Sequence, residues 1–323
     1  MNNIQKEVSL ARAEKQLCIN SRYSVFFWLK KYKFLYLMLI PGIIYFIIFR
    51  YLPIFGLVIA FKNFNFTKGI FGSEWVGLKH FISFFNYPES WRLIRNTFLL
   101  NLYNIIFAFP IAIIFAVLLN EVRESAYKKL VQTVSYLPHF ISTVVVVGIF
   151  YNFLSPSTGL INIILKDVFG VEPIAFLLQT RWFRTIYNTI NIWQETGWNA
   201  IIYLAALIGI DPALYESAYM DGAGRFKQFL YISLPCITST IVIMLVLRIG
   251  IIMEVGFESV MLLHSPATYE VSDIIPTYVY RRGIIDSDYS FTTAIGMFQS
   301  IIGLVLMLLS NKLAKKLTNS GLW

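Results

Sequence analysis

The stretch Glu216-Ser-Ala-Tyr-Met-Asp-Gly222, followed after nine residues by Ile232-Ser-Leu-Pro235, is a polar segment between two strongly apolar ones. Gly222 and Gly224 can supply the positive φ that ends a helix. Apolar and small residues then recur at helical spacing until Pro235. The sequence therefore predicts two short helices joined by a glycine turn.

The residues just before this segment indicate where the first short helix begins. Asp211 is a good N-cap, and Pro212 is tolerated at the first helical position, where its missing N–H would have no partner. The predicted helix carries Glu216, Ser217 and Ala218. An ordinary amphipathic loop would look similar over so short a stretch.

Composition places this segment in a membrane protein. Of 323 residues, 57% are hydrophobic, 17% are aromatic and only 14% are charged. A soluble domain of this length needs more polar surface, because charged residues are rarely buried unpaired. The excess of basic residues is typical of cytoplasmic loops and does not indicate nucleic acid. Two cysteines, Cys18 and Cys236, cannot form a disulfide framework or a metal site.

Six apolar runs are long enough to cross about 30 Å of hydrocarbon as helices. The sequence thus predicts an all-α membrane protein with six transmembrane helices. The runs cover approximately residues 34–61, 95–121, 131–154, 186–210, 234–257 and 289–309.

Lys and Arg are more numerous on the side that holds the N-terminus, the bias expected of cytoplasmic loops. Both termini are therefore expected to be cytoplasmic, and the Glu216 segment lies inside the cell between spans four and five. The predicted organisation is a cytoplasmic segment over 1–33, a transmembrane domain over 34–315 that contains a loop over 211–235, and a cytoplasmic tail over 316–323.

The order Glu216, Ala218, Gly222, Ile232 and Pro235 resembles the EAA loop in membrane subunits of binding-protein-dependent ABC importers, with Ser217 in place of the usual Ala. The resemblance implies a type I ABC importer permease fold. It also implies that the loop is a coupling helix that seats in a separate ATPase subunit. The residues expected at this contact are Glu216, Ser217, Ala218, Asp221, Gly222 and Gly224.

Further segments, among them residues 193–207, 210–216 and 273–281, are similar to permeases of carbohydrate importers, and more narrowly to those that take oligosaccharides, including uronic-acid-containing ones. The resemblance implies a multi-pass protein of the cell (inner) membrane. Its implied partners are a second homologous permease, two cytoplasmic ATPase subunits and an extracellular or periplasmic solute-binding protein.

The chain contains no G-x(4)-G-K-[ST] phosphate-binding loop, so we expect no ATP hydrolysis by this chain and no catalytic residue. The partner ATPase would bind ATP and Mg²⁺, and this chain would need no cofactor.

Polar residues within spans are costly in lipid and usually face a bundle interior or a water-filled path. Span four carries such a stripe at spacings of three and four, and amides, carboxylates and aromatic rings are suited to binding sugars. The alternative is that these groups bond neighbouring helices. The predicted substrate path is Asn188, Asn191, Glu195, Trp198, Asn199 and Tyr203, with Arg248 from span five.

Arg248 and Glu195 are the charges deepest in adjacent spans, and we expect them to pair; a snorkelling Arg248 is the alternative.

Two other functions stay open. A non-sugar ABC permease would differ in its path residues, and a self-contained secondary transporter would show inverted repeats.

Overall fold

The computed structural model describes residues 31–123, 125–254, 256–318 and 321–322. The chain divides into two units, residues up to Val58 and residues from Ile59 onward. Most of the predicted segment 1–33 and part of the predicted tail 316–323 lie outside the described residues. The predicted domain boundaries therefore stay predictions.

The first unit is helical throughout its described part. Helix α3 (Lys33–Phe46), the π-helix η1 (Ile47–Tyr51) and α4 (Leu52–Gly56) run into the 3₁₀ helix η2 (Leu57–Phe61), forming one apolar helix over Lys33–Phe61. Pro53 does not break it, because Pro occupies the first turn of α4, where its missing N–H costs little. The predicted first span is confirmed.

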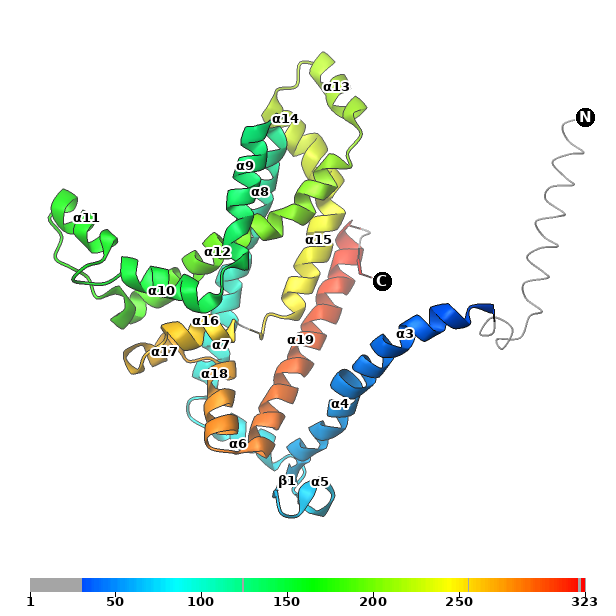
Figure 1. The fold of residues 1–323 in the computed structure, drawn as a ribbon, viewed down its shortest axis with the longest axis vertical. Coiled ribbons are helices and arrows are strands. Elements are labelled where there is room, and N and C mark those ends of the chain that lie inside the picture. The colour runs from blue at the N-terminus through cyan, green and yellow to red at the C-terminus, as the bar shows by residue number, and fades with distance from the viewer. Residues whose placement is uncertain (1–30, 124, 255, 319–320, 323) are drawn as a thin grey trace, which may run out of the picture. The chain divides into compact units, whose positions relative to one another are not determined.

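The second unit begins with small elements and then a long span (Figure 1). The antiparallel strands β1 (Lys62–Asn63) and β2 (Glu74–Trp75) flank α5 (Gly69–Gly72), and α6 (Lys79–Asn86) follows. Helix α7 (Ser90–Tyr103), the π-helix η3 (Asn104–Ala108) and α8 (Phe109–Glu121) form the second candidate span, Ser90–Glu121.

The third apolar run is not one straight span. Helix α9 (Ala126–Tyr136) and η4 (Leu137–Phe140) end at Ile141, and α10 (Thr143–Phe153) leaves at 101° to them. The bend lies where Pro138 removes a backbone donor and Ser142 caps α10, accepting from Val145 N–H at 3.5 Å. Helix α11 (Leu160–Phe169) and η5 (Phe176–Leu178) follow.

The fourth span, α12 (Thr180–Ile208), continues after a 70° bend into α13 (Pro212–Met220). Then α14 (Arg225–Gln228), the π-helix η6 (Phe229–Ser233) and α15 (Leu234–Gly250) form one helix over Arg225–Gly250. The predicted fifth span was too long, since α15 ends at Gly250 rather than near Phe257.

The chain returns to the bundle through a hairpin of short helices, and a long helix closes the fold. The hairpin consists of α16 (Phe257–Leu263), η7 (Pro266–Thr268), α17 (Tyr269–Ser272), α18 (Ile275–Val279) and η8 (Tyr280–Ile285). Helix α19 (Tyr289–Thr318) contains the last candidate span, Tyr289–Lys316. Counting each bent pair as one span gives up to six, as predicted.

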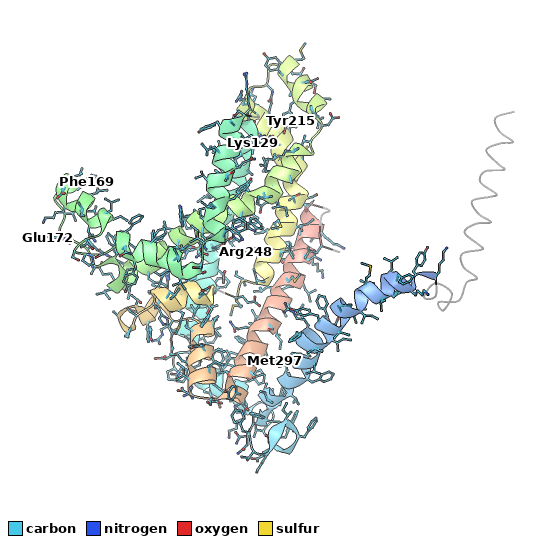
Figure 2. All side chains as sticks on the ribbon, viewed as in Figure 1. Lys129, Phe169, Glu172, Tyr215, Arg248 and Met297 are labelled. Carbon is cyan, nitrogen blue, oxygen red and sulfur yellow. The ribbon has the colours of Figure 1, made fainter. Side chains whose placement is uncertain are left out.

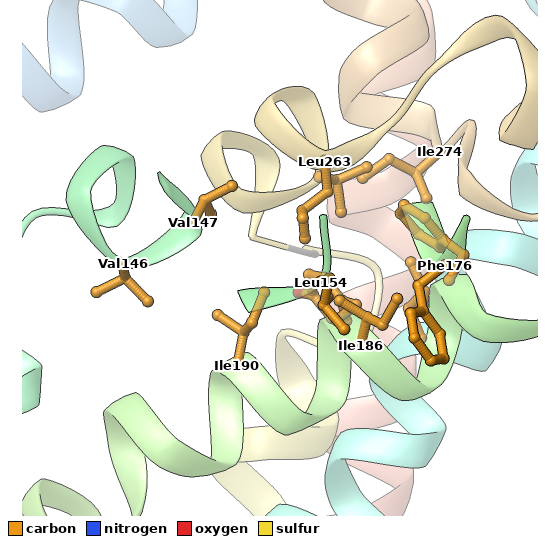
Figure 3. Packing of buried hydrophobic residues seen from close by; sticks show 12 residues of the cluster. Val146, Val147, Leu154, Phe176, Ile186, Ile190, Leu263 and Ile274 are labelled. Carbon is orange, nitrogen blue, oxygen red and sulfur yellow. The ribbon is translucent and has the colours of Figure 1, made fainter. Parts of the chain in front are cut away.

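Helix α12 organises the core of the second unit. At its N-terminal half, Ile186 and Ile190 pack with Val146 of α10 and Leu263 of α16 (Figure 3). At its C-terminal half, Ala200 and Leu204 pack with residues of α8 and α15, including Ala112 and Ile237. The residues of α12 between these two clusters include Asn191, Glu195 and Asn199, which lie at helical spacing on one side of the helix.

Candidate functional site

The glycine turn after α13 is a complete Schellman motif. Gly222 has φ +76, its N–H donates to the Tyr219 carbonyl at 3.0 Å, and the N–H of Ala223 donates to the Ala218 carbonyl at 2.9 Å. Those two bonds satisfy carbonyls that the helix end leaves free. A side chain at Gly222 would meet no neighbour, so its requirement for glycine comes from backbone conformation alone.

The rest of this segment partly departs from the prediction. Asp211 caps α13 as expected, accepting from Ala213 N–H at 3.0 Å. Gly224, however, has φ −70 and serves as N-cap of α14, so its predicted positive φ was wrong. The predicted helix end at Pro235 was also wrong. The helix continues through the π-helix η6 into α15, where the missing N–H of Pro235 is accommodated in the first turn.

We call residues 211–231 the coupling segment. Helix α13 has no buried residue, and Glu216, Ser217 and Asp221 are all exposed. Large apolar side chains are exposed beside them: Leu214, Tyr219, Met220, Phe226, Leu230 and Tyr231. Met220 is 84% exposed, so the segment presents an apolar surface and not a wholly polar loop.

Two polar contacts attach the coupling segment to the bundle. Tyr215 Oη lies 2.9 Å from Oγ of the buried Ser233, and Arg225 forms an ion pair of 3.3 Å with Glu121 at the end of α8. Figure 2 shows Tyr215 far from Arg248, which lies toward the middle of the bundle. A movement of α13 therefore reaches η6 through Tyr215, and a movement of α14 reaches α8 through Arg225.

The polar residues of α12 fall into two groups. Some form hydrogen bonds within α12, and others contact a neighbouring helix. Asn188 and Asn191 donate to carbonyls one turn earlier, those of Arg184 at 2.8 Å and Tyr187 at 2.9 Å. Asn188 is only 7% exposed, and its Oδ1 has no partner among the described residues. Its amide oxygen is therefore a buried acceptor without a hydrogen bond among the described residues.

Glu195 and Trp198 hold the broken third span. The carboxylate of Glu195 lies 3.1 Å from Nδ1 of His139, and the ring of His139 stacks on Trp198 with centroids 4.4 Å apart and an angle of 2°. At the bend, the Ile141 carbonyl accepts a hydrogen bond of 3.1 Å from the side-chain amide of Gln194. For these two residues the structure shows helix-to-helix bonding, the alternative use that the sequence left open.

The predicted pair of Arg248 with Glu195 was wrong. Arg248 instead donates to Oδ1 of the buried Asn104 at 2.7 Å, joining α15 to η3. Nearby, Asn101 donates to the Ile252 carbonyl at 2.7 Å. Both contacts link segments about 150 residues apart in the chain, so spacing within one helix could not reveal them.

Two cavities border the stripe. A small one, of about 60 Å³, brings together Asn199, Tyr203 and Arg248 as the sequence predicted, with Asn104 at their side. A larger one, of about 540 Å³, lies at the N-terminal half of α12 and includes Asn188. It also includes Arg181 and Arg184, which were not among the predicted path residues. Arg184 lies four residues before Asn188 and Arg181 three before Arg184, so the same spacing extends the stripe by about two turns.

The hairpin between α15 and α19 is fixed by a buried charge pair. Asp273, 1% exposed, accepts two hydrogen bonds from Arg281, at 2.9 and 2.7 Å. These bonds raise the pKa of Arg281. Burial lowers the pKa of His264 and raises that of Tyr278 to about 12.

Comparison with known proteins agrees with this architecture. The chain is 49% identical over 291 residues to the polygalacturonan/rhamnogalacturonan transport system permease protein YteP of Bacillus subtilis, covering 90% of each chain. It is 47% identical to protein LplB of the same organism, over 91% of this chain and 92% of that one.

A solved structure of a bacterial alginate ABC transporter, in complex with an alginate pentasaccharide-bound periplasmic protein, contains a chain of the same fold. Its TM-score is 0.85 at 44% identity, and the match covers 92% of this chain and 99% of that one. Residues 108–319 match the family described as binding-protein-dependent transport system inner membrane component. The chain is a member of this family, a multi-pass permease of ABC importers.

Proposed function

We propose that this permease carries oligosaccharides that contain uronic acids into the cell. Two relatives support this substrate class, since one is named for polygalacturonan and rhamnogalacturonan and the other for alginate, and both match over most of the chain. Polygalacturonan and alginate are both acidic polymers. The small cavity of about 60 Å³ is lined by an amide, a hydroxyl and a cation, from Asn199, Tyr203 and Arg248, which are groups suited to acidic sugars, but in this conformation it has room only for water-sized groups.

The transporter is proposed to contain a second homologous permease, two cytoplasmic ATPase subunits that bind ATP and Mg²⁺, and an extracellular or periplasmic binding protein. Both termini and the coupling segment are then cytoplasmic. The hairpin and the loops at the opposite end face the binding protein.

The observation that carries the coupling role is the exposed apolar surface around Glu216, with Tyr219, Met220 and Phe226 each at least 75% exposed. An ATPase cleft would bury this surface. Glu216, Ser217, Ala218, Asp221 and Gly222 are the proposed contacts, with Gly224 starting the next helix. Closure of the ATPases would move α13, and Tyr215 and Arg225 would pass that movement to the bundle.

Two experiments test this function. Uptake of labelled trigalacturonate is measured in cells with and without this gene, and loss of uptake in the deletion strain is expected. Uptake that persists there, while a non-sugar solute is lost, contradicts the substrate class. Copurification with the ATPase subunits tests the coupling role. A complex that survives Glu216→Lys combined with Gly222→Pro would contradict it.

A further inference from the structure

The larger cavity lies between the N-terminal half of α12 and the second span. It is lined by Arg181, Arg184, Asn188 and Ile192 along one face of α12, and by Tyr103 and Phe107 from α7 and η3. Its volume of about 540 Å³ is within the range of sites that bind small ligands. The end of α12 that borders it is the one remote from the coupling segment.

The two arginines give this cavity a positive charge without a matching carboxylate. Among the described residues, neither Arg181 nor Arg184 forms an ion pair, although Arg181 donates from Nε to Gln179 Oε1 at 2.9 Å and lies over the Trp182 ring. Arg184 donates only weakly, from Nη2 to Asn96 Oδ1 at 3.4 Å, and its Nε is buried without a partner in the described part of the chain. A buried donor of this kind is costly unless something else accepts its hydrogen bond.

Two further features suit a sugar ring. The unpartnered Oδ1 of Asn188 is an acceptor for a hydroxyl group, and Asn188 is more than nine-tenths buried. Tyr103 and Phe107 line the same cavity, and their rings lie 6.1 Å apart and nearly parallel, at 14°. Aromatic faces of this kind pack against the apolar face of a pyranose.

We propose that this cavity binds one uronic-acid unit of the substrate, with its carboxylate on Arg184 and Arg181, a hydroxyl on Asn188 and its ring against Tyr103 and Phe107. Arginine is suited to the task because its planar guanidinium binds a carboxylate through two hydrogen bonds. The proposal rests on the proposed function. It adds a subsite outside the small cavity that holds Arg248.

The test uses the permease–ATPase complex in phosphatidylcholine nanodiscs, which contain no anionic lipid. Binding of trigalacturonate and of the neutral galactotriose is measured with ATP and without nucleotide. Wild type is expected to bind trigalacturonate more tightly in at least one state. In Arg181→Gln/Arg184→Gln the affinity for trigalacturonate falls about tenfold and that for galactotriose changes little.

The matched control is Lys166→Gln on α11, which removes an exposed cation away from the cavity and is expected to keep the preference. Arg184→Lys keeps the positive charge without the planar pair of donors and is expected to be intermediate. Equal losses for both sugars, or a preference unchanged in the double variant, would overturn the subsite. An absent preference in both nucleotide states would overturn it as well.

The uptake experiment distinguishes the two proposals. If wild-type cells import trigalacturonate but the double variant retains full preference, only the subsite is wrong. If wild-type cells import no acidic oligosaccharide, the substrate class itself is wrong.

Discussion

Gly303 of α19 lies against Gly250 at the end of α15, so closely that a Cβ added to Gly303 would stand 2.6 Å from the Gly250 carbonyl oxygen. Small residues let membrane helices approach, and here backbone meets backbone. Gly303→Ala should therefore destabilise the protein by about 1–3 kcal/mol, the usual range for overpacking. The melting temperature of the purified permease is the measurement.

Gly296, seven residues earlier in α19, provides the control, because a Cβ there meets nothing within 4 Å. Gly296→Ala should leave the melting temperature unchanged or raise it slightly, since Ala favours helix. Equal losses in both variants would mean that the helix contact at Gly250 is not responsible.

The sequence predicted the spans well because lipid imposes a minimum length on an apolar helix, and the continuous helix over Lys33–Phe61 confirms this even across Pro41 and Pro53. The bend after Phe140 was missed, although Pro138 and Ser142 mark it. The bend also depends on a hydrogen bond from Gln194 of α12 to the Ile141 carbonyl. Because these residues are 53 positions apart, the sequence near the bend could not reveal it.

The partners of the polar span residues could not be predicted for a related reason. Helical spacing correctly put Asn188, Asn191 and Glu195 on one face, but it does not say which helix that face meets. We therefore expected Glu195 to pair with Arg248. In the structure its partner is His139, which lies 56 positions earlier in the chain. The coupling segment was easier to predict, because its turn is held by bonds within five residues.

The Schellman turn at Gly222 predicts a selective loss of coupling. Gly222→Ala places a side chain at φ +76, at a cost of roughly 1–2 kcal/mol for the left-handed conformation. The end of α13 should then shift, and less ATPase should copurify with the complex. Gly170→Ala is the matched control: its φ of +64 imposes a similar backbone cost and its Cβ meets nothing, but it lies outside the coupling segment, so ATPase binding should be unchanged. Similar losses in the two variants would contradict the role of the turn.

His264 predicts a pH dependence of stability. Burial lowers its pKa in the folded protein, whereas in the unfolded chain the value is about 6.5. As the pH falls below about 6.5, the unfolded state takes up a proton that the folded state resists, so stability decreases until the lower, folded pKa is reached. The ring of His264 lies 5.1 Å from that of Tyr269, and His264→Phe retains a ring there. The variant should show a weaker decline in melting temperature between neutral and acidic pH. A decline that is identical in wild type and variant would assign the effect to other groups.

The hydrogen bond from Arg248 to Asn104 predicts that the two residues act as a unit. Asn104 is buried, and among the described residues Arg248 is the donor to its side-chain oxygen, so Arg248→Met leaves a buried amide oxygen unsatisfied. Arg248→Met, Asn104→Leu and the double variant form a cycle in which the double variant should lose less stability than the two single losses together. The difference should be about 1.5–3 kcal/mol, as for hydrogen bonds to charged groups. Losses that simply add would show that the contact contributes nothing to stability, and Arg248 would then be free to serve the substrate alone.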